Sequence, residues 1–164
     1  MAKPYKDATK ISIVLSVLAL IGIILGLVLG SALPTMILLL PTIIYEVYRT
    51  EGRSTKLSSW LLLGVFVLEL AALIFSIEFD LIEYLGVEEK WVAGYEVPLG
   101  DIKVVAPSIM AILSVVLFTR TYGKYTKWLA VIIFITSFAI IYILDSTIFE
   151  RLVKFAVEEG FESI

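Results

Sequence analysis

One carboxylate, Glu69, interrupts the otherwise apolar run GVFVLELAALIF at residues 64–75. Inserting an acidic side chain at the centre of a membrane helix costs ~2.5–3.5 kcal/mol, so Glu69 is expected to face protein and not lipid. Its neighbours at helical spacing include Ala72 and Ser76, which are small enough for a closely packed face. An acid in this position is a candidate proton- or cation-binding residue. The alternative is a neutral, hydrogen-bonded strut, and the sequence leaves both readings open.

The groups available to accompany Glu69 are few. The chain contains no histidine and no cysteine, and its sequence shows no asparagine or glutamine. The groups that can contact the Glu69 carboxylate are therefore hydroxyls, backbone groups, water or a bound cation. Beside Ser76, the hydroxyls of Thr42 and Ser108 are the candidates for an ion- or proton-binding site with Glu69.

A short apolar segment at residues 34–48 is a second place where chemistry is possible. Pro41 lies inside it and predicts a kink, because proline removes a helical hydrogen bond. Broken helices line substrate sites in many transporters, although a short helix can also be a simple mismatch with bilayer thickness. At its end, Glu46 and Arg49 are three residues apart and can pair on one helical face.

The loop at residues 78–101 is strongly acidic. Its carboxylates could concentrate cations at a pore mouth or bind Ca²⁺ or Mg²⁺ through oxygen. Their spacing matches no calcium loop, so the metal is unknown, and a solvated extracytoplasmic loop is the alternative. The acidic residues that define this loop are Glu78, Asp80, Glu83, Glu88 and Glu89.

Gly22, Gly26 and Gly30 repeat at four-residue intervals in GIILGLVLG. Small residues at this spacing let another helix approach closely. Either an internal contact or a self-association face would satisfy the pattern, and we favour internal packing.

Composition excludes several classes of function. The net charge of −3 gives no reason to expect a nucleic-acid partner. Without histidine or cysteine, a Ser-His or Cys-His nucleophile is impossible, and no cofactor is expected. The sequence shows no cluster of catalytic groups, so an enzyme is disfavoured. The lack of Cys, Asn and Gln fits a hyperthermophile source, because these side chains are thermolabile.

The elements that must position these residues are membrane helices. Hydrophobic residues make up 60% of the chain and the mean hydropathy is +0.99, well above a soluble domain at ~45–50% apolar. A single all-α transmembrane domain over residues 1–164 is predicted, with an amphipathic surface helix at residues 147–159. The five predicted spans cover residues 11–29, 34–48, 57–77, 102–119 and 128–144.

Charge predicts the orientation, because Lys and Arg concentrate on the cytoplasmic side. Five spans with the N-terminus inside place nine basic residues inside and four outside. A re-entrant second segment would reduce this asymmetry to seven against six. We therefore expect five spans in the cytoplasmic (plasma) membrane of a prokaryote, with the C-terminus outside. The nine inner residues would be Lys3, Lys6, Lys10, Arg49, Arg53, Lys56, Arg120, Lys124 and Lys127.

Two functional hypotheses follow. The first is a proton- or cation-linked transporter or ion pathway that uses Glu69, with the acidic loop attracting cations. The second is a non-catalytic subunit or scaffold of a larger membrane complex. The expected partners are the lipid bilayer and either further copies of the chain or other subunits.

Overall fold

The computed structural model describes residues 7–76, 91–92, 95–96, 102–147, 149–150 and 154. Long helices account for most of this part of the chain. They are α1 (Ala8–Leu29), α2 (Ala32–Arg49), α3 (Arg53–Ile74), α5 (Ile102–Arg120) and α6 (Lys124–Leu144), together with the short antiparallel strands β1 (Trp91–Val92) and β2 (Tyr95–Glu96).

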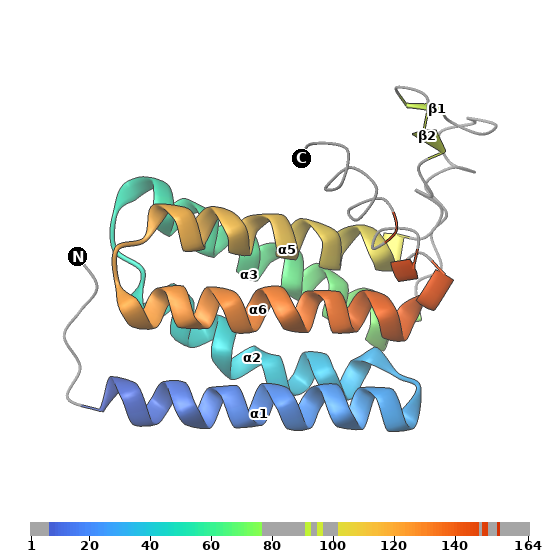
Figure 1. The fold of residues 1–164 in the computed structure, drawn as a ribbon, viewed down its shortest axis with the longest axis horizontal. Coiled ribbons are helices and arrows are strands. Elements are labelled where there is room, and N and C mark those ends of the chain that lie inside the picture. The colour runs from blue at the N-terminus through green and yellow to red at the C-terminus, as the bar shows by residue number, and fades with distance from the viewer. Residues whose placement is uncertain are drawn as a thin grey trace.

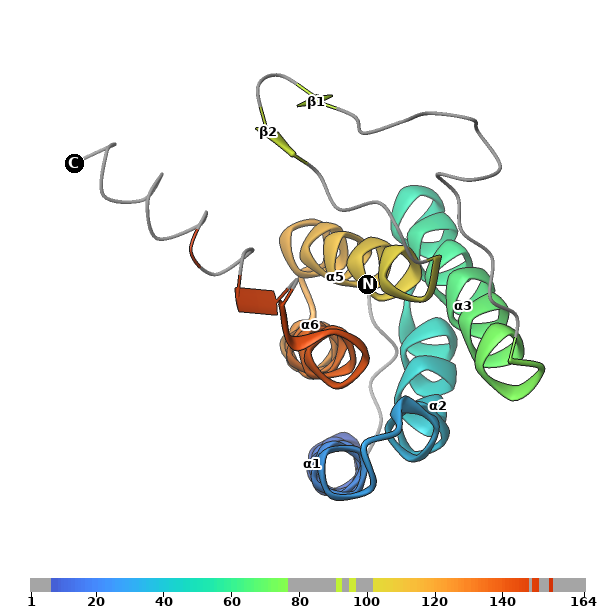
Figure 2. The same ribbon diagram turned by 90° about the vertical axis from the view of Figure 1, so that its right-hand side faces the viewer.

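The five long helices run alongside one another in a bundle (Figure 1). Seen end-on, α2 lies between α1 and α3 and also contacts α6, while α5 packs on α3 and α6 (Figure 2). The connections from α1 to α2, from α2 to α3 and from α5 to α6 are short, so these sequential helices are antiparallel neighbours. α1 lies at the margin of the bundle and packs on α2 and α6.

The core forms where the buried stripe of α2 meets α3, α5 and α6. Apolar side chains recur along α2 at helical spacing, as expected for a helix with one buried face. Their partners on the other helices are also removed from solvent. The fully buried members of this core are Met36, Leu39, Ile43, Leu62, Phe66, Met110, Leu117, Ile133 and Ile140.

Large apolar side chains also cover the outside of the bundle. Val28 is 77% exposed and Leu68 is 72% exposed, and soluble proteins rarely present large contiguous surfaces of this kind. In the described part of the chain, α1, α3 and α6 are long and apolar enough to cross a membrane, and Val104–Arg120 is a shorter apolar helix. The protein is therefore a helical membrane protein.

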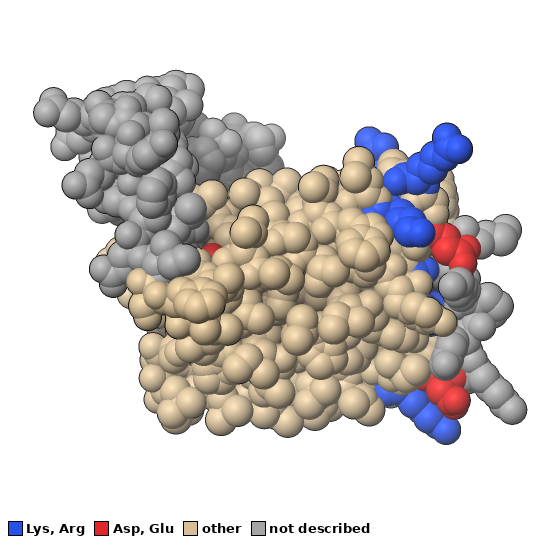
Figure 3. Space-filling view, turned by 180° about the vertical axis from the view of Figure 1, so that it is seen from behind, with Lys and Arg blue, Asp and Glu red and all other residues tan. Residues whose placement is uncertain are grey.

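Basic residues gather at one end of the bundle (Figure 3). This end is formed by the start of α1, the α2–α3 connection and the α5–α6 connection. Its described basic residues are Lys10, Arg49, Arg53, Lys56, Arg120, Lys124 and Lys127. We call it the basic end; α1 and α6 both begin there.

The helices begin and end within a few residues of the expected spans. α3 ends at Ile74, three residues before the predicted boundary of 77, because Phe75 and Ser76 form a turn in which Ser76 has a φ of 49°. Pro41 lies inside α2, and α2 is assigned as one helix across it, so a kink there stays a prediction. Most of the predicted 147–159 helix lies outside the described residues.

Candidate functional site

Glu69 lies inside the bundle, with 2% of its surface exposed. It continues the buried stripe of α3, which begins at Thr55 near the basic end and passes through Leu62 and Phe66. This helix packs against α2 and α5, so the carboxylate is directed towards protein, as expected from the cost of exposing it to lipid. The placement is compatible with both a binding site and a structural strut.

The three hydroxyls expected beside Glu69 lie on α2, on α5 and just after α3. Ser76 is exposed at the end of α3, seven residues after Glu69. The Ser108 hydroxyl donates a 2.8 Å hydrogen bond to the Val104 carbonyl of its own helix. Thr42 is fully buried, on α2, and its Oγ1 has no hydrogen-bond partner in the described part of the chain.

Glu78, Asp80, Glu83, Glu88 and Glu89 lie outside the described residues. Among the residues that are described, no three acidic side chains come close enough together to hold a metal ion.

A second buried carboxylate, Glu46, lies near the basic end of α2 and has no exposed surface. Thr50 Oγ1 donates to Glu46 Oε1 at 3.0 Å and to the Glu46 carbonyl oxygen at 2.8 Å. The other carboxylate oxygen, Oε2, has no hydrogen-bond partner among the described residues. Oε1 is thus held by a hydrogen bond from Thr50, and Oε2 is available to a further group.

Arg49 lies one turn further along α2 and is only 4% exposed. Its Nη1 donates to the Tyr45 hydroxyl at 3.1 Å, and its Cζ lies 5.6 Å and 5.3 Å from the ring centroids of Tyr45 and Tyr125. Cation–π contacts of this kind stabilise a guanidinium that is withdrawn from water. Arg49 is three residues after Glu46 on α2, so the two charged groups are neighbours on one helical face.

The burial of Glu46 is the feature that sequence reasoning missed. The YEVYR segment reads as an interfacial helix end, where a pair of opposite charges is ordinarily solvated. A signal was nevertheless present, because Thr35, Leu39, Thr42 and Glu46 recur on one helical face. That face is the buried face of α2, so the stripe extends the core to the basic end.

An apolar layer separates the two buried carboxylates. Phe66 and Leu62 lie one and two turns from Glu69 towards the basic end, and Leu39 lies on α2 on the Glu69 side of Glu46. All three are fully buried. These side chains form an apolar layer on α2 and α3 between the two carboxylates.

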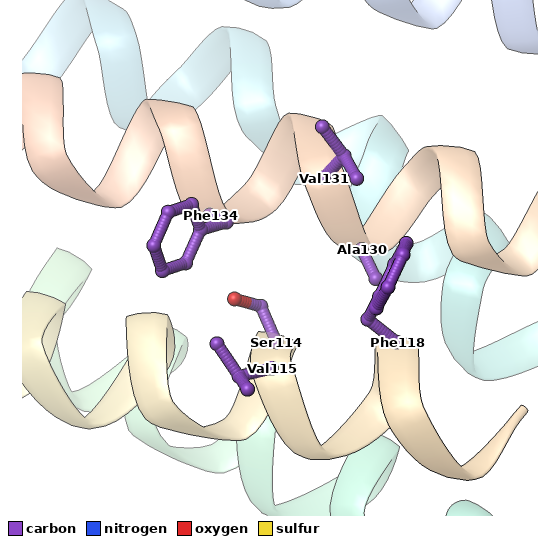
Figure 4. Close-up of a pocket in the computed structure, with 6 residues that line it drawn as sticks. All are labelled: Ser114, Val115, Phe118, Ala130, Val131 and Phe134. Atoms are coloured by element: carbon purple, nitrogen blue, oxygen red, sulfur yellow. The ribbon is translucent and has the colours of Figure 1, made fainter. Parts of the chain in front are cut away.

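A pocket of about 200 Å³ opens between α5 and α6 (Figure 4). The only hydroxyl among its lining side chains belongs to Ser114, which donates to the Ala111 carbonyl oxygen at 2.6 Å. The acceptor of this hydroxyl is a backbone carbonyl and not a base that could activate it as a nucleophile. The pocket therefore offers mainly apolar surface to a bound molecule. Its lining residues are Ser114, Val115, Phe118, Ala130, Val131 and Phe134.

The glycine stripe of α1 meets α2. A Cβ on Gly22 would lie 3.0 Å from Leu38 Cβ, and a Cβ on Gly26 would collide with Thr35 Oγ1 and lie 2.8 Å from Ile143 Cδ1. These two glycines correspond to the internal-packing alternative. Gly30 differs, because it has a φ of 60° and ends α1 as its C-cap.

Comparisons with known protein families, with curated proteins and with solved structures give no match.

Proposed function

We propose that this protein is a small membrane carrier or ion pathway for protons or cations, with Glu69 as the residue that binds the ion. The supporting observation is a carboxylate that is 2% exposed in α3, a helix apolar enough to cross the membrane. Intramembrane acids that face protein are functional candidates because their insertion is costly. Part of that cost is offset when the acid binds a proton or a cation.

In this proposal all five long helices cross the membrane. The basic end faces the cytoplasm, in line with the positive-inside rule, and the end of α6 lies outside. The acidic loop after α3 would then face the exterior and attract cations.

The test is ion flux into proteoliposomes that contain the full chain. Proton entry, followed with a pH-sensitive dye, and sodium or potassium entry, followed with ion-sensitive dyes, should exceed flux into empty vesicles. Glu69→Gln keeps the size of the side chain and removes its charge, so it should abolish the flux. Glu51→Gln makes the same chemical change at an exposed position and should leave flux intact. Equal flux through wild type and Glu69→Gln would remove Glu69 from the mechanism.

The second candidate is a non-catalytic subunit or scaffold of a membrane complex. The buried apolar layer of Leu39, Leu62 and Phe66 favours it. An ion pathway needs polar groups along its route between the carboxylates, whereas a scaffold does not. Purification from the native host in a mild detergent separates the two candidates. A subunit should co-purify with stoichiometric partners, whereas a stable, partner-free particle would count against this role.

A further inference from the structure

Three buried oxygen atoms near the basic half of the bundle have no hydrogen-bond partner in the described part of the chain. They are Glu46 Oε2, Ser12 Oγ and Thr42 Oγ1. Each of the three residues has 0% of its surface exposed. Buried polar atoms are almost always paired, because leaving one unpaired costs free energy. A group of such atoms is therefore a place where a small polar guest would be stabilised.

The packing of α1 on α2 brings two of these atoms to the same level. The helices are antiparallel, and Gly22 faces Thr35 and Leu38 across the interface. Nearer the basic end, Ile11 and Leu15 line one groove together with Ile44 and Tyr48. Ser12 lies between Ile11 and Leu15 in the chain, so this register places it alongside the turn of α2 that contains Glu46.

The orientation of these side chains agrees with the register. Ser12 shares the buried face of α1 with Ala19 and Gly26, which are seven and fourteen residues further on. Thr42 and Glu46 are four residues apart on the buried face of α2, so their side chains are neighbours on that helix. Ser12 thus lies on the buried face of α1, and Thr42 and Glu46 lie on the buried face of the neighbouring helix α2.

We propose that Glu46, Ser12 and Thr42 form a binding site for a monovalent cation of the size of sodium. The three available atoms are all oxygens, which suit hard cations and not metals that prefer nitrogen or sulfur. Water would complete the coordination. The Glu46 carboxylate supplies the negative charge at the site. The nearby Arg49 guanidinium, held against Tyr45 and Tyr125, repels a divalent ion twice as strongly as a monovalent one, so the site favours the single charge.

This site deepens the proposed function by naming an ion and a second carboxylate. It rests on the proposed function only for the claim that the bound ion crosses the membrane. Binding itself requires no transport, so a cation that stabilises a subunit would occupy the same site.

The test is the thermal unfolding of the full chain in detergent, in sodium chloride and in choline chloride at equal ionic strength. A ligand that binds only the folded state raises the unfolding temperature as its concentration increases. Sodium should therefore raise the midpoint in a saturable manner, and choline should not. An unfolding temperature that is identical in the two salts at every concentration would overturn the proposal.

Variants assign the response to these residues. Glu46→Gln keeps an acceptor for Thr50 and should abolish the sodium response. Ser12→Ala and Thr42→Val should each weaken the apparent sodium affinity at least about tenfold. If Glu46→Gln does not fold, the double variant of Ser12 and Thr42 tests the site in its place. Ser58→Ala removes an exposed hydroxyl that bonds only the Ser54 carbonyl and should respond as wild type does.

The Glu69→Gln variant distinguishes the sodium site at Glu46 from the proposed ion pathway through Glu69. The sodium response should survive in this variant, because the site lies on the other side of the apolar layer. A response lost in Glu69→Gln and retained in Glu46→Gln would overturn the site at Glu46. A sodium response without flux in proteoliposomes would instead confirm the site and reject transport.

Discussion

The Thr35 hydroxyl on α2 donates a 2.8 Å hydrogen bond to the carbonyl oxygen of Gly22 on α1. This bond crosses the interface at the glycine stripe, where the absence of side chains on α1 allows α2 to approach. The Gly22 carbonyl already belongs to the helical ladder of α1, so Thr35 uses its second lone pair. The contact makes the α1–α2 interface specific as well as close.

Gly26→Ala should destabilise the bundle by about 1–3 kcal/mol, because the added methyl group overpacks the interface. A Cβ there would collide with Thr35 Oγ1 and lie 2.8 Å from Ile143 Cδ1. Gly64→Ala is the matched control, since nothing lies within 4 Å of a Cβ at that position of α3. The measurement is the unfolding midpoint in detergent, followed by tryptophan fluorescence. Equal midpoints for the two variants would contradict the close packing of α1 on α2.

Thr50→Val should cost about 1–3 kcal/mol of stability, because it removes the hydroxyl that bonds a buried carboxylate. Valine has nearly the same shape, so the loss would report the hydrogen bonds to Glu46 at 2.8 Å and 3.0 Å. Thr119→Val makes the same change at an exposed hydroxyl that bonds only carbonyls of its own helix. Its effect on the unfolding midpoint should be close to zero, and a similar loss in both variants would deny Glu46 a buried position.

Single cysteines should map the proposed topology without background, because the chain has no cysteine of its own. Tyr122→Cys, at a fully exposed position of the basic end, should react with a membrane-impermeant maleimide only after the cells are opened. Thr147→Cys, beyond the end of α6, should react in intact cells. The opposite pattern at both positions would contradict the proposed orientation. A cysteine at Ser54 should follow Tyr122→Cys and provides an internal check.

Phe149→Ala should loosen the segment that follows α6. The Phe149 ring lies 6.4 Å from Phe138 and 5.3 Å from Tyr142 in edge-to-face geometry, and such pairs contribute about 0.5–1.5 kcal/mol beyond simple burial. Limited proteolysis of the purified protein should therefore cleave after residue 145 faster than in wild type. Phe75→Ala, a change at a ring that is 74% exposed, should leave this rate unchanged. Identical cleavage of Phe149→Ala and wild type would show that the aromatic contacts do not hold the segment.

The helices themselves were predictable because lipid imposes a strong rule. A chain in the hydrocarbon core must satisfy its backbone hydrogen bonds internally, so long apolar segments become helices. Gly30 and Pro34 were sufficient to divide the first apolar stretch, and the structure has α1 end at Leu29 and α2 begin at Ala32. The burial of Glu69 also followed from its cost in lipid.

The surroundings of each carboxylate were not predictable in the same way. Ser108 could bond either Glu69 or its own helix, and the local Val104 carbonyl is its acceptor. Glu46 could lie at the interface or inside, and one-dimensional hydropathy does not distinguish these places. The choice depends on which helices cover that face of α2, and they come from distant parts of the sequence.

The sequence by itself determined that this is a helical membrane protein, that its basic residues cluster between particular helices, and that carboxylates and hydroxyls are its available chemistry. Those properties depend on local composition and on helical periodicity. Only the tertiary structure decided that Glu46 is as deeply buried as Glu69, that an apolar layer lies between them, and that Ser12 is level with Glu46. Each of these depends on the register of one helix against another, which is set by packing contacts such as Gly22 with Thr35.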